Sequence, residues 1–178
     1  MNRAQLEHLI RAAAVIVADD EIVIVGSQSI LGQFPDAPRE LCLSMEADLY
    51  PLGHPERADL IDGSIGEGSP FHATFGYYAQ GVGPETAVLP RGWLDRAVRV
   101  YSPATRGSTG LALEVHDLLV SKYAAAREKD RDFARAAFKH GLARPETALE
   151  RLAQTTLGSE RMEAALSALS ADAASTGR

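Results

Sequence analysis

Apolar residues recur every three or four positions between residues 3 and 18, and this periodicity predicts an amphipathic helix. Asn2 and, three residues later, Gln5 form a typical helix start, because each side chain can bind the backbone of the other residue. Residues 22–25 are consecutive β-branched residues without polar alternation, which favours a short strand covered on both faces. We expect this strand to lie in the middle of a sheet.

Apolar and polar positions alternate strictly between residues 41 and 50, as in a strand that turns one face to the core. In this alternation Glu46 and Asp48 fall on the same polar face, whereas Ala47 between them points into the core. Pro51 ends the predicted strand. Two carboxylates are thus expected side by side on an exposed strand face.

Weaker patterns predict the other elements of the chain. They are a short helix capped by Ser27 that reaches about Gly32, a helix over 55–62 that stops at Gly63, a glycine-rich loop over 63–68, a strand over 71–80 bent at Gly76, two strands over 97–101 and 111–115, and four helices with apolar stripes over 118–126, 133–138, 145–152 and 162–169. A tail from about Ala171 is expected to be frayed. The predicted fold class is therefore α/β (α+β), with a small mixed-sheet core over residues 1–115 followed by a C-terminal helical bundle over residues 116–178.

The composition fits a globular chain. Of the 178 residues, 46% are hydrophobic and 24% are charged, so the chain can bury a core, which argues against wholesale disorder. No apolar run is long enough to cross a bilayer and the N-terminus lacks the apolar core of a signal peptide, so we expect a cytoplasmic protein without a membrane partner. The single cysteine, Cys42, excludes an internal disulfide and a cysteine-based zinc cluster.

Charge divides the chain into two different parts. Residues 1–70 carry 4 basic and 12 acidic side chains, and residues 71–178 carry 14 basic and 12 acidic ones. An acidic part beside a slightly basic part is consistent with a metal-binding face next to a surface that tolerates phosphates. The isoelectric point near 5.4 argues against a protein that wraps duplex DNA, and no sequence-specific DNA binding is expected.

Glu46 and Asp48 are the first candidates for chemistry. Two carboxylates at alternate positions on one strand face can hold the same divalent cation or two adjacent ones. Magnesium takes one or two carboxylates, with water and phosphate oxygens as its further ligands. The plainer alternative is a solvated acidic strand edge.

Gly26 and Ser27 are the second candidates, because they follow the predicted central strand and open a helix. Glycine allows close backbone approach, and the serine hydroxyl and the N–H groups of a helix start can bind phosphate oxygens. The alternative is an ordinary connection from strand to helix with a good cap. The combination of this bend with the two acids is more specific than either feature alone.

Together, a strand, Gly26-Ser27, a short helix and then Glu46-x-Asp48 resemble the polymerase-β-type nucleotidyltransferase superfamily, whose pattern is Gly-Ser or Gly-Gly followed by Asp-x-Asp. The chain is also similar to small bacterial nucleotidyltransferase-like proteins related to abortive-infection toxins of the AbiE type, at residues 25–31, 116–122 and 129–132. The resemblance spans residues 20–140 and departs at position 46, where the family usually has aspartate.

This resemblance implies an enzyme that transfers a nucleoside monophosphate from a nucleoside triphosphate to a hydroxyl group of a tRNA, a protein or a small molecule. It implies that Glu46 and Asp48 hold Mg²⁺, and that Gly26, Ser27 and Lys122 restrain the phosphates. It also implies a cognate antitoxin protein as a partner if the chain is part of a toxin–antitoxin pair.

Two other functions fit the same residues. One is a nucleotidyltransferase-like scaffold with weakened catalysis that binds a nucleotide or a partner protein, and the glutamate at position 46 supports it. The other is an unrelated carboxylate hydrolase, which would need the two acids to flank a cleft instead of lining one strand face.

Lys122 lies inside the apolar stripe of its predicted helix, three residues from Leu119 and four from Leu118 and Ala126. A lysine at the margin of such a stripe can also reach solvent with its long side chain, and the pattern alone leaves this alternative open. The resemblance favours Lys122 as a residue of the site.

Other charged residues are less clearly placed by the sequence. A solvated helix junction is the expected setting of Arg127, Lys129, Asp130 and Asp132, although the related segment of the family faces the cleft. Asp95 and Glu114 are both candidates for a third carboxylate, because two-metal transfer usually needs a further acid.

The histidines and aromatic residues are expected to have structural roles. His72 and His116 lack the spacing of zinc ligands. Packing in the sheet is the expected role of Phe75, Tyr77 and Tyr78.

Overall fold

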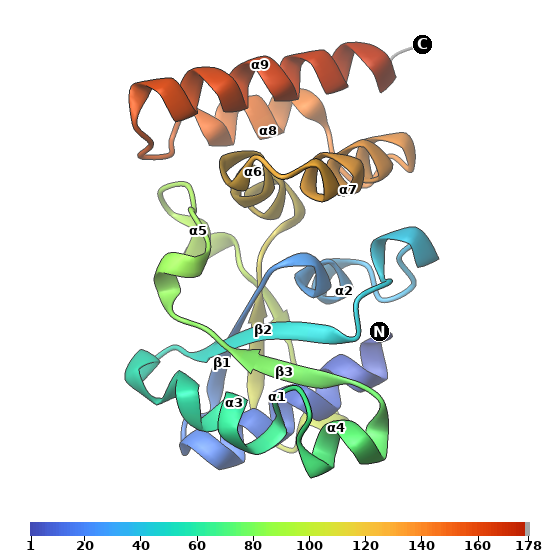
Figure 1. Cartoon of the computed structure of the whole chain (residues 1–178), viewed down its shortest axis with the longest axis vertical. Helices are drawn as coiled ribbons and strands as arrows, with labels where there is room; N and C mark the ends of the chain where they lie inside the picture. The colour runs from blue at the N-terminus through green and yellow to red at the C-terminus, as the bar shows by residue number, and fades with distance from the viewer. Residues whose placement is uncertain (177–178) are drawn as a thin grey trace.

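The computed structural model describes residues 1–176, which form a five-stranded mixed sheet covered by helices (Figure 1). The strands are β1 (Glu21–Val25), β2 (Glu46–Pro51), β3 (Tyr78–Gly81), β4 (Val98–Val100) and β5 (Thr109–Ala112), in the order β3-β2-β1-β5-β4. β1 pairs antiparallel with β2 and parallel with β5, whereas β3 runs parallel to β2 and β4 antiparallel to β5. The predicted fold class, α/β (α+β) with a helical C-terminal region, is confirmed.

The helices form two groups, one packed on the sheet and one made of the C-terminal helices (Figure 1). One side carries α1 (Arg3–Val17), α3 (Ala58–Ile65) and α4 (Pro70–Phe75). The same side carries α2 (Ile30–Gln33), because Gly32 lies against Ala112 of β5, and Gly110, two residues earlier in β5, lies against Ile10 of α1. The C-terminal helices α6 (Val115–Ala125), α7 (Glu128–Lys139), α8 (Pro145–Leu152) and α9 (Ser159–Thr176) form a separate group that begins shortly after β5. Shorter turns complete the chain: α5 (Trp93–Arg96) and the 3-10 helices η1 (Ser27–Ser29), η2 (Arg39–Leu41), η3 (Pro55–Arg57), η4 (Pro84–Thr86) and η5 (Pro103–Thr105).

The strongest sequence patterns predicted the right elements. β1 is the central strand, and its residues Ile22 to Val25 are all buried. α1 begins with a capping box, in which the Gln5 N–H donates to Asn2 Oδ1 (3.0 Å) and the Asn2 N–H donates to Gln5 Oε1 (2.9 Å). The predicted helices after His116 are confirmed as α6 to α9.

The predicted strand over residues 41–50 is wrong in its first half, because β2 begins only at Glu46. The residues before it form η2 and an irregular segment in which Leu43 is 69% exposed. β1 ends opposite Asp48 and β3 begins opposite Glu46, so the preceding residues have no strand beside them. An alternating pattern becomes a strand only where a neighbouring strand supplies hydrogen bonds.

The predicted strand over residues 71–80 is also wrong in its first half, which is the helix α4. Ser69 caps this helix by accepting a hydrogen bond from the His72 N–H (3.1 Å), and Pro70 suits the first helical position. Gly76, with φ +73°, ends the helix in the left-handed conformation. Only the last residues of the predicted strand form β3.

Two predicted helix boundaries are wrong. Ser27 does not cap a helix, because it is the first residue of η1 and Gly26 precedes it without a side-chain cap. Gly63 does not stop α3, which continues to Ile65 and so includes the start of the predicted glycine-rich loop. Ile61 and Ile65 are both buried one turn apart, and this packing outweighs the cost of a glycine inside the helix.

The last predicted elements hold in part. The strand over 97–101 is confirmed as β4, whereas the strand expected over 111–115 lies earlier, as β5. α9 does not fray at Ala171, because Asp172 accepts hydrogen bonds from Arg131 (2.8 Å) and Tyr123 (3.1 Å) and holds the helix end. Residues 177–178 of the predicted tail lie outside the described residues.

A hydrophobic core runs from α1 through the sheet to α9. The division into parts at residues 1–115 and 116–178 therefore stays a prediction, although α6 begins at the expected border. None of the helices within residues 1–176 is long and apolar enough to cross a membrane.

Candidate functional site

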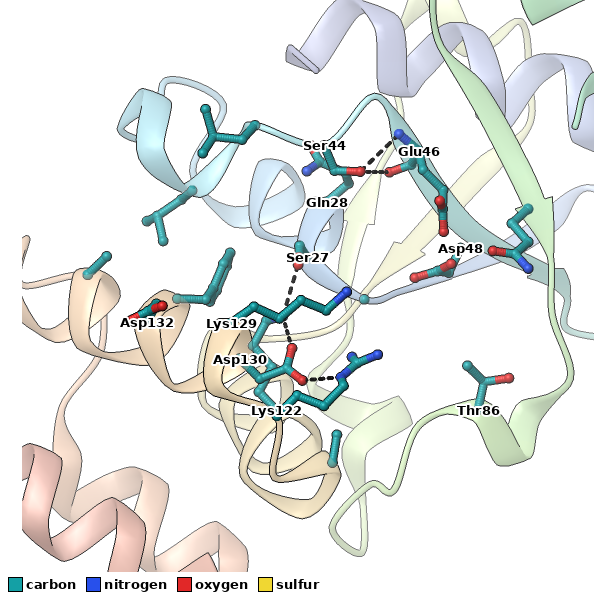
Figure 2. Close-up of a pocket in the computed structure, with 18 of the residues that line it drawn as sticks. Ser27, Gln28, Ser44, Glu46, Asp48, Thr86, Lys122, Lys129, Asp130 and Asp132 are labelled. Atoms are coloured by element: carbon teal, nitrogen blue, oxygen red, sulfur yellow. Dashed lines mark hydrogen bonds and ion pairs between the residues drawn. The ribbon is translucent and has the colours of Figure 1, made fainter. Parts of the chain in front are cut away.

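A cleft of about 1000 Å³ lies between the sheet and the C-terminal helices. Figure 2 shows the two acids of β2 on the strand wall, Lys122 and Asp130 on the facing helices, and Ser27 between them. The cleft is lined by all of the residues predicted to form the site: Gly26, Ser27, Glu46, Asp48 and Lys122. Segments that are distant in the sequence converge here.

Glu46 and Asp48 lie on the same face of β2, and Ala47 between them is buried in the core. Burial and the neighbouring Glu46 carboxylate raise the pKa of Asp48 to about 7, although Lys122 and Arg127 act in the opposite direction. The two carboxylates repel each other when both are charged. A divalent cation between them would remove this repulsion.

Gly26 lets the Asp48 carboxylate lie directly against the bend that follows β1. Its φ of +67° favours glycine, and a Cβ atom at this position would overlap Asp48 Oδ2. Any larger residue would therefore displace the carboxylate. The bend and the acid pair share one hollow, as the sequence predicted.

Lys122 is buried and points into the cleft, so the alternative of a solvent-reaching lysine is wrong. Its Nζ atom donates hydrogen bonds to Ser27 Oγ (2.9 Å) and Asp130 Oδ1 (3.0 Å). The same atom lies 4.3 Å from the ring centroid of Phe133. Burial lowers the pKa of Lys122, and the Asp130 carboxylate counteracts this effect. The lysine thus connects the helical region to the bend after β1.

Asp130 is the acid that holds Lys122 in place. Its carboxylate also accepts a hydrogen bond from Arg127, and only 2% of its side chain is exposed. Burial would raise the pKa of Asp130, but the hydrogen bonds from Arg127 and Lys122 outweigh it and hold that pKa below its usual value. The expectation of a solvated junction is therefore wrong for Asp130, whereas Lys129 and Asp132 are exposed at the rim of the cleft.

Neither predicted third carboxylate lines the cleft. Glu114 caps α6 by accepting a hydrogen bond from the His116 N–H (3.0 Å), and its other oxygen accepts one from His116 Nδ1 (2.7 Å). Asp95 lies in α5 and is not one of the residues that line the cleft. Asp95 and Glu114 were candidates for a third metal ligand only because they are acidic. The sequence does not show which acidic side chains lie near one another in the fold.

The two histidines have the structural roles expected of them. His116 Nε2 accepts a hydrogen bond from the Arg144 N–H (2.9 Å), so Nδ1 carries the proton that goes to Glu114. His72 Nδ1 accepts a hydrogen bond from the Gly68 N–H (3.0 Å). Each histidine therefore holds a loop against a helix.

Gln28 and Tyr78 belong to the site region but were not predicted for it. Gln28 lines the cleft, only 1% of the residue is exposed, and neither atom of its amide has a hydrogen-bond partner among the described residues. Tyr78 Oη donates a hydrogen bond to Glu46 Oε2 (2.9 Å). Of the aromatic residues expected to pack in the sheet, only Tyr78 lies in a strand, since Phe75 belongs to α4 and Tyr77 precedes β3.

The donor set of the cleft fits magnesium. Within residues 1–176 no group of three or more His, Cys, Asp or Glu side chains is arranged to hold a metal ion. Magnesium, however, needs only one or two carboxylates when water and phosphate oxygens complete its shell. The pair formed by Glu46 and Asp48 meets this requirement, and its mutual repulsion favours a cation.

Comparisons of the chain with protein-family models, with curated proteins and with solved structures gave no match. The functional argument therefore depends on the geometry of the cleft.

Proposed function

We propose that the chain is a magnesium-dependent nucleotidyltransferase, which transfers a nucleoside monophosphate from a nucleoside triphosphate to a hydroxyl group and releases pyrophosphate. The observation that carries this proposal is the convergence in one cleft of an acid pair, a glycine-serine bend and a buried lysine. This convergence has the order and spacing of the nucleotidyltransferase pattern that the sequence resembles.

Glu46 and Asp48 are the proposed magnesium ligands. When bound, Mg²⁺ would polarise the α-phosphate and favour the deprotonated form of the acceptor hydroxyl. Because the pKa of Asp48 is about 7, the pair holds part of a proton at neutral pH and must release it to act as a full ligand.

Ser27 and Lys122 are the proposed phosphate ligands. Ser27 Oγ accepts a hydrogen bond from Lys122, so the hydroxyl proton of Ser27 is available for a phosphate oxygen. Asp130 and Phe133 keep the Lys122 ammonium within the cleft, where its charge stabilises an anionic leaving group. Gly26 keeps the bend close enough to the acids for one triphosphate to contact both.

The acceptor is proposed by class only: a hydroxyl group of a tRNA, another protein or a small molecule. Residues 91–151 carry 12 basic and 8 acidic side chains, which permits RNA binding. A cytoplasmic location and a cognate antitoxin protein belong to the same proposal.

A second candidate is a scaffold with weakened catalysis that binds a nucleotide or a partner protein. The observation that favours it is Glu46, which replaces the usual aspartate and has one oxygen engaged by Tyr78. This scaffold would keep magnesium-dependent nucleotide binding and lose transfer.

The two candidates are separated by a transfer assay. Purified protein is incubated with Mg²⁺, total RNA and each of the four α-labelled nucleoside triphosphates, beside the variants Asp48→Asn and Asp132→Asn. The enzyme predicts a labelled product that Asp48→Asn abolishes and that the exposed rim variant Asp132→Asn retains. Magnesium-dependent nucleotide binding without product or pyrophosphate release would instead favour the scaffold.

A further inference from the structure

Glu46 and Tyr78 are directly opposite each other on the parallel strands β2 and β3. Register partners in a sheet turn their side chains to the same face, so the two side chains can meet. The Tyr78 hydroxyl donates its proton to Glu46 Oε2 at 2.9 Å. Glu46 lines the cleft and Tyr78 does not, so the tyrosine supports the carboxylate from outside the cleft.

Tyr78 is itself fixed by its surroundings. Its backbone N–H donates to Met45 O (3.0 Å), which anchors the residue at the start of β3. Its ring packs against the His72 ring of α4, with the ring centroids 4.6 Å apart. The hydroxyl group is therefore a donor at a fixed position.

A glutamate needs such a donor more than an aspartate does. Its side chain has one more rotatable bond, so it loses more conformational entropy when the carboxylate is held as a ligand. The hydrogen bond from Tyr78 restricts this freedom and uses only Oε2, which leaves Oε1 for a cation shared with Asp48. An aspartate at position 46 would be shorter by one methylene group and would not reach Tyr78 in the same way.

We propose that Tyr78 is a positioning residue for metal binding, and that its cross-strand hydrogen bond makes glutamate an effective ligand at position 46. The inference rests on the magnesium site of the proposed function. The inference explains why a glutamate can replace the usual aspartate at position 46: Glu46 and Tyr78 act as a pair, in which the tyrosine holds the glutamate carboxylate in place.

The test is a Mn²⁺ titration of the purified protein, with free Mn²⁺ measured by electron paramagnetic resonance. Mn²⁺ prefers the same oxygen ligands as Mg²⁺. Tyr78→Phe removes only the hydroxyl group and should raise the Kd for Mn²⁺ about tenfold, the effect typical of losing a partner that orients a metal ligand. The matched control is Tyr77→Phe, because the Tyr77 hydroxyl bonds His8 (2.7 Å) and the residue does not line the cleft. This control should leave the Kd unchanged.

A double-mutant cycle separates positioning from a general structural effect. In the Glu46→Asp background the shorter side chain does not make the same hydrogen bond with Tyr78, so adding Tyr78→Phe should change the Kd less than about twofold. The proposal would be overturned if Tyr78→Phe weakened Mn²⁺ binding equally in the wild-type and Glu46→Asp backgrounds.

The same titration distinguishes failure of this inference from failure of the proposed function. Wild-type binding that Asp48→Asn abolishes and Tyr78→Phe leaves unchanged would reject the role of Tyr78 alone. No Mn²⁺ binding by the wild type, or equal binding by Asp48→Asn, would reject the metal site and this inference together.

Discussion

Lys122 Nζ donates a hydrogen bond of 2.9 Å to Ser27 Oγ, although the two residues lie 95 positions apart in the sequence. The contact joins the helical region to the bend after the central strand. It brings the only buried lysine among residues 1–176 to the wall that also carries Asp48. The proposed function depends on this junction, and several of its contacts can be tested separately.

Replacing Lys122 should destabilise the protein, because the buried Asp130 carboxylate would lose a cationic partner. Lys122→Met keeps the length of the side chain but removes one of the two cations that pair with buried Asp130, so the free energy of unfolding should fall by about 1–3 kcal/mol. Urea unfolding measures this change. Asp130→Asn in the same chain should restore part of the loss, whereas the exposed control Lys129→Met should change stability by less than about 0.5 kcal/mol. If Lys122→Met and Lys129→Met lowered the free energy of unfolding equally, the result would contradict a stabilising ion pair between Lys122 and Asp130.

Gly26→Ala should abolish metal binding, because the new methyl group would occupy the place of the Asp48 carboxylate. Gly141→Ala is a matched control, since Gly141 has the same φ of +67° but no atom within 4 Å of the place that a Cβ atom would take. In both variants the alanine must adopt a left-handed backbone conformation, which should lower the free energy of unfolding by about 1–2 kcal/mol. Only Gly26→Ala should also lose the rise in Tm that Mg²⁺ gives the wild type, and a retained rise would show that Asp48 does not need this space.

The raised pKa of Asp48 predicts a pH-dependent stability. The folded protein holds a proton on the acid pair up to about pH 7, whereas an unfolded aspartate releases it near pH 3.8. The folded state therefore binds more protons between these values, and this contribution to stability is lost as the pH rises from about 4 to 7, by up to about 4 kcal/mol.

The variant Asp48→Asn isolates this effect. Its stability relative to the wild type should increase as the pH rises from 4 to 8, because the amide is never charged. Denaturant unfolding at several pH values measures the difference. A constant difference across this range would mean that Asp48 titrates as an ordinary exposed aspartate.

Gln28→Met should stabilise the protein. The amide of Gln28 is buried without a partner among the described residues, and its removal should raise the free energy of unfolding by about 1 kcal/mol. Gln33→Met should instead lower the free energy of unfolding. Gln33 Oε1 accepts a hydrogen bond from the Val115 N–H (2.9 Å), and the variant would lose this bond. A loss of stability in both variants would indicate that an ordered water serves the Gln28 amide.

The parts of the fold that depend on local pattern could be predicted from the sequence. The capping pair at the start of α1 was sufficient to predict a helix, and the β-branched run of β1 was sufficient to predict a strand. The two-residue period placed Glu46 and Asp48 on one face, and this holds even though the predicted strand was too long. The same period failed at Leu43, because only a neighbouring strand decides where β2 begins.

The contacts that complete the site could not be predicted in this way. Asp130 faces the cleft because α7 folds back on α6, and its charged neighbours suggested a solvated turn instead. Tyr78 reaches Glu46 only through the register of β2 and β3, which the sequence does not specify. Gln28 carries no motif, and the surroundings of its buried amide follow only from the packed fold.

The central claim is that one cleft holds a magnesium-bound nucleoside triphosphate between the acid pair and the bend. Calorimetric titration with non-hydrolysable triphosphate analogues, with and without Mg²⁺, tests it most directly. The wild type should bind in a magnesium-dependent manner, and Asp48→Asn and Lys122→Met should each weaken binding about tenfold or more, as expected for losing a charged contact. Binding that is independent of Mg²⁺, or that both variants retain, would contradict the proposed site.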